Sequence, residues 1–60
     1  MCKDSNGSIL SVDDEIMYID ENGCEFEGTI IKLLNDNKLR FEYEGGVMTI
    51  NASSCFILPS

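Results

Sequence analysis

Three turn signals divide this chain into short segments that are rich in β-branched and aromatic residues. The signals are Asn22-Gly23, Asn35-Asp36-Asn37 and Glu44-Gly45-Gly46. Each is built from residues that tolerate the backbone angles of tight turns, and Asn-Gly is among the strongest hairpin signals. Evenly spaced short strands between such turns are typical of small all-β sandwiches and barrels. The spacing therefore predicts an antiparallel all-β fold.

Five strands follow from these boundaries. The expected strands cover residues 15–19, 24–34, 38–43, 47–50 and 55–58, with a single 3₁₀ turn at residues 51–54 and Pro59 as the stop. The second strand alternates cleanly until Ile30-Ile31, and Gly28 lets it coil, so a bulge or bend is expected there. A helix over residues 30–34 is the alternative, but its β-branched pair and the adjacent turn argue against it.

The expected domain is one barrel over residues 9–58, preceded by a flexible lead-in at residues 1–8, with a short edge strand near residues 8–10 as an option. With 60 residues the chain has room for one small core and for a shallow binding site only. The alternation of apolar and polar residues assigns that core to Ile16, Tyr18, Phe26, Ile30, Leu33, Leu39, Phe41, Ile50 and Ile57.

The order of these features resembles the SH3-like barrels of the Tudor and KOW type over residues 9–58. Asp14-Glu15-Ile16 opens the first strand, Gly28-Thr29-Ile30 lies in the second, and one 3₁₀ turn leads into the last. The resemblance implies a closed five-stranded barrel that binds a partner. Tudor readers hold a cation in an aromatic cage, and the positions that correspond to it are Tyr18, Phe26, Phe41 and Tyr43. Glu44 stands where such readers commonly carry an aromatic residue before the turn glycine.

Charge limits the class of partner. The net charge is −7, from eleven acidic and four basic residues. Such a field repels nucleic-acid phosphates and attracts basic proteins, so direct binding to nucleic acid is not expected. The alternative is that the acidity only keeps a small protein in solution. The residues expected to contact a basic partner are Asp20, Glu21, Glu25, Glu27, Glu42 and Glu44.

Catalytic and metal chemistry has few residues to draw on. The chain has no histidine, and its three cysteines form no CxxC pair, so neither a catalytic centre, a cofactor nor a metal site is expected. The start carries no apolar signal core and no apolar run could span a membrane, which predicts a cytoplasmic protein without membrane contact. The Met1-Cys2 start also resembles that of small hydrogenase-assembly chaperones and a related nickel-binding group, which implies a thiol or nickel role for Cys2.

Two functions remain in view. The first is a non-catalytic acidic interaction module that docks on a basic protein surface, such as a small phage-type inhibitor or regulator of a nucleic-acid-processing enzyme. The second is a Tudor-like reader of a cationic or methylated peptide.

Overall fold

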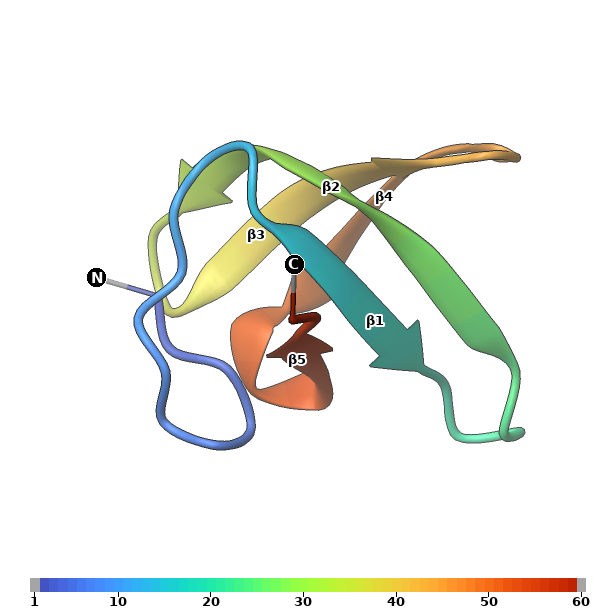
Figure 1. Ribbon diagram of the computed structural model, residues 1–60, viewed down its shortest axis with the longest axis horizontal. Helices are drawn as coiled ribbons and strands as arrows, with labels where there is room; N and C mark the ends of the chain where they lie inside the picture. The colour runs from blue at the N-terminus through green and yellow to red at the C-terminus, as the bar shows by residue number, and fades with distance from the viewer. Residues whose placement is uncertain (1, 60) are drawn as a thin grey trace.

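The computed structural model describes residues 2–59 as one antiparallel sheet and a single 3₁₀ turn (Figure 1). The elements are β1 (Glu15–Ile19), β2 (Glu25–Leu34), β3 (Lys38–Tyr43), β4 (Gly46–Asn51), η1 (Ala52–Ser54) and β5 (Cys55–Ile57). The strands lie in the order β4-β3-β2-β1-β5. The predicted all-β fold, its five strands and the 3₁₀ turn before the last strand are confirmed.

The turns lie where the sequence places them. Asp36 and Asn37 adopt φ angles of 63° and 57° between β2 and β3, which short polar side chains tolerate better than most residues. Between β1 and β2, Gly23 alone takes the positive φ, at 84°, and its N–H donates to the Asp20 carbonyl at 3.0 Å. The carbonyl of Asp20 therefore closes this turn by accepting the Gly23 N–H.

A bulge bends β2 where the alternation of its sequence breaks. The register with β3 shifts between Ile30 and Lys32, so Ile31 is the extra residue and its side chain is exposed. An extra residue on one strand bends it and increases its twist. The long β2 can therefore pair with β1 over one half and with β3 over most of its length (Figure 1).

The core lies on one face of this curved sheet. Five of the nine predicted core residues are buried, and the other four, Tyr18, Phe26, Leu33 and Ile57, are half-buried and pack against them. Four further apolar residues are buried that the alternation did not predict: Cys2, Leu10, Ala52 and Cys55. Phe41 is the largest side chain with no exposed surface.

The sheet is open, in contrast to the closed barrel that the resemblance implies. Within residues 2–59, β4 pairs only with β3 and β5 pairs only with β1, so no ladder joins β4 to β5. The η1 turn makes the connection between them. Consequently the sheet has two edges, and the unpaired backbone groups at each edge need protection other than closure of the barrel.

The N-terminal segment is part of the packed structure, which differs from the lead-in expected at residues 1–8. Cys2 and Asp4 are buried, and Lys3 forms an isolated antiparallel bridge with Ile9. The N–H of Ser5 donates to the carbonyl of Cys55 at 2.9 Å, so the segment lies along the outer edge of β5. Met1 lies outside the described residues.

Candidate functional site

The outer face of the sheet, opposite the core, gathers carboxylates from three neighbouring strands. Thr29 on β2 is paired with Glu15 on β1 and with Glu42 on β3. Directly opposite residues of an antiparallel sheet project from the same face. Glu27, two residues before Thr29, therefore projects from this face as well. The alternation predicted the outward direction of Glu27 and Glu42, and the register adds Glu15.

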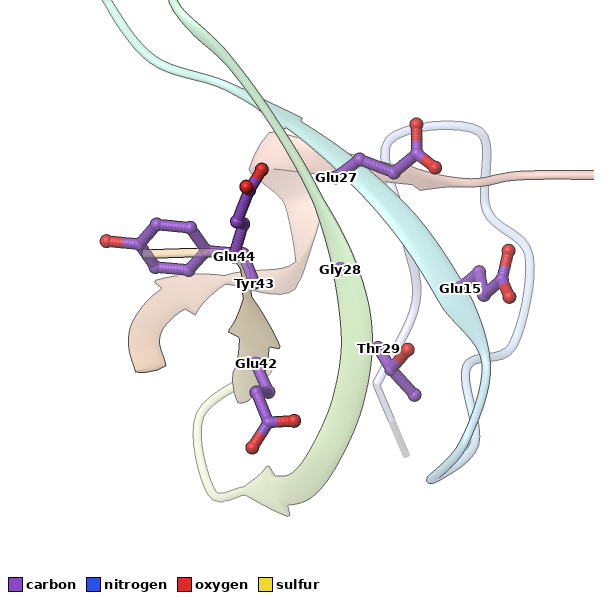
Figure 2. A pocket seen from close by; sticks show the side chains of 7 residues that line it. All are labelled: Glu15, Glu27, Gly28, Thr29, Glu42, Tyr43 and Glu44. Carbon is purple, nitrogen blue, oxygen red and sulfur yellow. The ribbon is translucent and has the colours of Figure 1, made fainter. Parts of the chain in front are cut away.

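These residues line a shallow groove of about 390 Å³. Its lining comprises Glu15, Glu27, Gly28, Thr29, Glu42, Tyr43 and Glu44. Figure 2 shows Glu42 and Glu44 on one side of the β2 ribbon, and the carboxylates of Glu15 and Glu27 on the other. We call this site the acidic groove. Carboxylates that line one groove repel one another, and a cationic partner would relieve that repulsion.

Gly28 sets the spacing of the strands beneath the acidic groove. A Cβ built on Gly28 would overlap the backbone oxygen of Glu42 and would lie 2.6 Å from a ring carbon of Phe41. No side chain fits in that space, so only glycine lets β2 approach β3 this closely. The carboxylates of Glu27 and Glu42 therefore depend on Gly28 for their relative position.

The other carboxylates expected at the partner surface lie outside the groove. Glu25 is opposite Ile19 near the β1–β2 turn, and Glu21 is exposed at that turn. Asp20 has a structural role, because its Oδ1 accepts hydrogen bonds from the N–H groups of Asn22 and Cys24, each at 2.9 Å. Of the six predicted residues, Glu27, Glu42 and Glu44 thus form the groove.

The sequence analysis missed Glu15. Its position follows from the β1–β2 hairpin of the structure, where the N–H of Asp20 donates to the Cys24 carbonyl and closes the ladder. Counting five residues back along β1 and five forward along β2 from that pair places Glu15 opposite Thr29. The register of one hairpin was therefore enough to find it.

Basic side chains lie at the opposite end of the same sheet face. Lys32 on β2 is paired with Arg40 on β3, and Lys38 lies two residues before Arg40 on the same strand. The Nε of Arg40 donates to the hydroxyl of Thr49 on β4 at 3.3 Å. Three of the four basic residues of the chain are therefore gathered at the β2–β3 turn end of the sheet, away from the acidic groove.

The four aromatic residues proposed as a cage lie in one cluster on the core side of the sheet. Tyr18 stacks on Phe26 with ring centroids 5.9 Å apart, and Tyr43 meets Phe26 edge-on at 5.5 Å. Phe41 contacts both tyrosines, at 6.3 and 5.7 Å, and is completely buried. The rings of Tyr18, Phe26 and Tyr43 are half-buried, so only these three have surface to offer a ligand.

The two buried thiols belong to the fold. The Cys2 thiol donates to the Lys38 carbonyl at 3.2 Å, and the Cys55 thiol donates to the Ala52 carbonyl at the same distance. Burial, with smaller contributions from the charges of Asp4 and Cys2, raises the pKa of the Cys55 thiol from 9.0 to about 11. Cys24 is exposed. The role implied for Cys2 by the Met-Cys start therefore falls on a residue that is only 3% exposed.

Residues 2–59 contain no cluster of three His, Cys, Asp or Glu side chains arranged to hold a metal ion. The same residues contain no helix with the length and apolar character needed to cross a membrane.

Comparison with other proteins identifies the family. No curated protein and no solved structure matches this chain. One family model does, and it covers residues 2–59, which include the N-terminal segment that packs on β5 as well as the whole sheet. The chain belongs to the family described as a domain of unknown function, DUF7205.

Proposed function

We propose that this protein is a non-catalytic interaction module that docks on a basic protein surface through its acidic groove. The observation that supports the proposal is that four carboxylates, those of Glu15, Glu27, Glu42 and Glu44, line one hollow of the outer sheet face. The partner fitted to it presents Lys or Arg side chains at a matching spacing, which is the chemistry of nucleic-acid-binding proteins. A small phage-type inhibitor or regulator of such an enzyme, working in the cytoplasm, would have this form.

Electrostatics support the binding of a basic partner at a groove of this kind. Clefts lined by one sign of charge focus the field and raise the rate of encounter with an oppositely charged partner. Exposed carboxylates on a rim act mainly on the association rate and on its salt dependence. The net charge of −7 extends the same attraction over the whole chain.

The experiment compares the wild-type chain with a groove-reversed variant in which Glu27, Glu42 and Glu44 are changed to Lys. Both chains are immobilised and exposed to a lysate of the native host. Proteins captured by the wild type and lost from the variant are identified, purified and measured in binding kinetics. We expect basic proteins in this set, with association that slows as salt is added. Equal capture by the two chains would count against the groove.

A single-site comparison controls for the change in net charge. Glu27→Lys and Glu21→Lys each alter the charge by the same amount, and both side chains are exposed. Only Glu27 lines the acidic groove. The proposal therefore requires a larger loss of association rate for Glu27→Lys. An equal loss for both variants would mean that net charge alone attracts the partner.

The second candidate function is a Tudor-like reader of a cationic or methylated peptide. The strand order, the bulged second strand and the 3₁₀ turn before β5 support placing the domain among SH3-like folds of the Tudor and KOW type. The observation that favours a reader is the contact of three half-buried rings, Tyr18, Phe26 and Tyr43. A ligand cation would have to sit within about 6 Å of these ring faces.

A titration with a trimethyllysine peptide tests this alternative. Binding should shift the NMR resonances of Tyr18 and Tyr43, and an unmethylated peptide should bind more weakly. Tyr43→Leu keeps an apolar side chain at the site and removes the aromatic ring, so it should abolish the preference for the methylated peptide. Absence of shifts at millimolar peptide would leave the aromatic cluster as core packing alone.

A further inference from the structure

The two edges of the open sheet differ in whether their outward backbone groups are hydrogen-bonded. At β5, the N–H of Ile57 is bonded by the Asp4 carboxylate at 2.9 Å, and the carbonyl of Cys55 accepts the N–H of Ser5 at 2.9 Å. The N-terminal segment thus covers the outward backbone groups of that strand. At β4, residues 2–59 supply no corresponding backbone partner, since its only ladder is with β3.

The backbone groups at the free edge of β4 belong to its odd-numbered residues. The N–H of Ala52 donates to the Asn37 carbonyl, which extends the β3–β4 ladder by one pair. Hydrogen-bonded pairs alternate along an antiparallel ladder, so Ile50 and Met48 also bond toward β3. The N–H and C=O groups of Val47 and Thr49, and the N–H of Asn51, therefore point away from the sheet.

The side chains of β4 do nothing to block this edge. Natural proteins protect edge strands with charged residues, proline, bulges or a covering segment. The strand Gly46–Asn51 reads GVMTIN, without charge or proline, and its pairing with β3 has no bulge. Val47 is 52% exposed. An uncharged, regular edge strand of this kind is a template for a further strand.

We propose that the edge of β4 pairs with β4 of a second copy of this chain, antiparallel and about a two-fold axis at Thr49. Thr49 is the middle one of the three outward-bonding residues, so centring the axis there lets all three find partners. Thr49 then faces its own copy, and Val47 lies opposite Asn51. On the core side of the sheet, Met48 lies opposite Ile50, which places apolar side chains against each other.

This arrangement also suits the uneven charge of the sheet. Glu42 is paired with Val47 at one end of β4, and Lys38 is paired with Asn51 at the other. Antiparallel pairing of two β4 strands therefore brings the acidic end of one copy to the same end as the basic residues of its partner. Because the axis is perpendicular to the sheet, the two acidic grooves would face the same side, as two equivalent sites for a basic partner.

The test is the oligomeric state of the whole chain, measured by sedimentation equilibrium with wild type and three variants. Thr49→Pro removes an N–H that points outward and leaves the β3–β4 bonds intact. Thr49→Lys keeps the N–H but sets two like charges face to face on the axis. Thr49→Ala keeps the N–H and adds no charge. We expect a dimer for wild type and Thr49→Ala, and folded monomers for the Pro and Lys variants.

Amide hydrogen exchange adds a readout at the edge itself. In the wild-type dimer the N–H of residue 49 should exchange slowly. In the monomeric Thr49→Lys variant the N–H at the same position should exchange fast, while the N–H groups of Met48 and Ile50 stay protected. A wild-type chain that remains monomeric at millimolar concentration would overturn the proposal. The same holds if the edge pairs only with a strand of a different protein. A dimer that survives both Thr49→Pro and Thr49→Lys would also overturn it. None of these results depends on the acidic groove.

Discussion

The carboxylate of Asp4 accepts a hydrogen bond from the backbone N–H of Ile57, which lies 53 residues later in the chain, at 2.9 Å. Its other oxygen accepts the N–H groups of Asn6 and Ser8, at 2.9 and 2.8 Å. One buried side chain thus shapes the N-terminal loop and attaches it to β5. Both oxygens are needed, because the three donors approach from two sides.

Replacement of Asp4 by Asn should destabilise the fold by about 1.5–3 kcal/mol, the range for hydrogen bonds to a charged group. The Asn side chain has one acceptor oxygen in place of two. Its NH₂ group must therefore face at least one backbone N–H, and two donors cannot form a hydrogen bond. Asp20→Asn is the matched control. Asp20 accepts both of its bonds through Oδ1 alone, which an amide oxygen can reproduce. Chemical denaturation should show a large loss for Asp4→Asn and little for Asp20→Asn.

The same carboxylate gives the fold a dependence on acid. Burial by itself would raise the pKa of Asp4, but the backbone N–H groups of Ile57, Ser8 and Asn6 outweigh it and lower the pKa below 3.8. A group with a lowered pKa in the folded state stabilises above its unfolded pKa, and the contribution disappears as pH falls through the folded value. The difference in unfolding free energy between wild type and Asp4→Asn should therefore shrink below pH 3.8. A difference independent of pH would contradict this.

Phe41 should be the most costly aromatic residue to truncate. Its side chain is fully buried, so Phe41→Ala should lose roughly 3–5 kcal/mol, enough to unfold a domain of this size. Val47→Ala, at a side chain that is 52% exposed, should change the unfolding free energy by less than about 0.5 kcal/mol in the monomer. A Phe41→Ala chain that melts at the wild-type temperature would show that the ring is not part of the core.

Much of the fold could be predicted from local patterns, and the reason is visible at particular residues. Strong turn chemistry at Gly23 and Asn37 fixes where strands end, and alternation then determines which side chains face the core. The N-terminal segment could not be predicted in this way. Its polar sequence is typical of a flexible tail, and the bond that holds it, from Ile57 to Asp4, joins the two ends of the chain.

The acidic groove was predictable in part for the same reason. Glu27 and Glu42 follow from alternation within one strand, whereas Glu15 needs the register between two strands. Closure of the barrel was expected from a resemblance between families, and no residue in this sequence reports directly on whether β4 and β5 pair. The open edge of β4 is therefore a result of the three-dimensional structure.

Gly28→Ala should disturb the acidic groove and the core together. The new methyl group would overlap the Glu42 carbonyl, and backbone cannot move away as a side chain can. Overpacking of this kind costs typically about 1–3 kcal/mol or more. At Gly45, by contrast, the nearest atom is a ring carbon of Tyr43, at 2.7 Å, and the ring can shift. The melting temperature of the Gly45→Ala variant should therefore be well above that of the Gly28→Ala variant.

The three thiols should differ sharply in reactivity. Cys24 is exposed, whereas Cys55 is buried and its raised pKa leaves almost no thiolate at pH 8. A disulfide reagent such as dithionitrobenzoate should label the folded chain in one fast phase, and Cys24→Ser should remove that phase. Persistence of fast labelling in Cys24→Ser would show that a buried thiol is accessible.

The measurement that tests the central claim most directly is the association rate of a captured partner across a series of salt concentrations. It is made with the wild-type chain and with the variant that carries Lys at positions 27, 42 and 44. The account predicts fast association for wild type that slows steeply with salt, and slow, nearly salt-independent association for the variant. Equal rates and equal salt dependence for the two chains would show that the partner binds elsewhere.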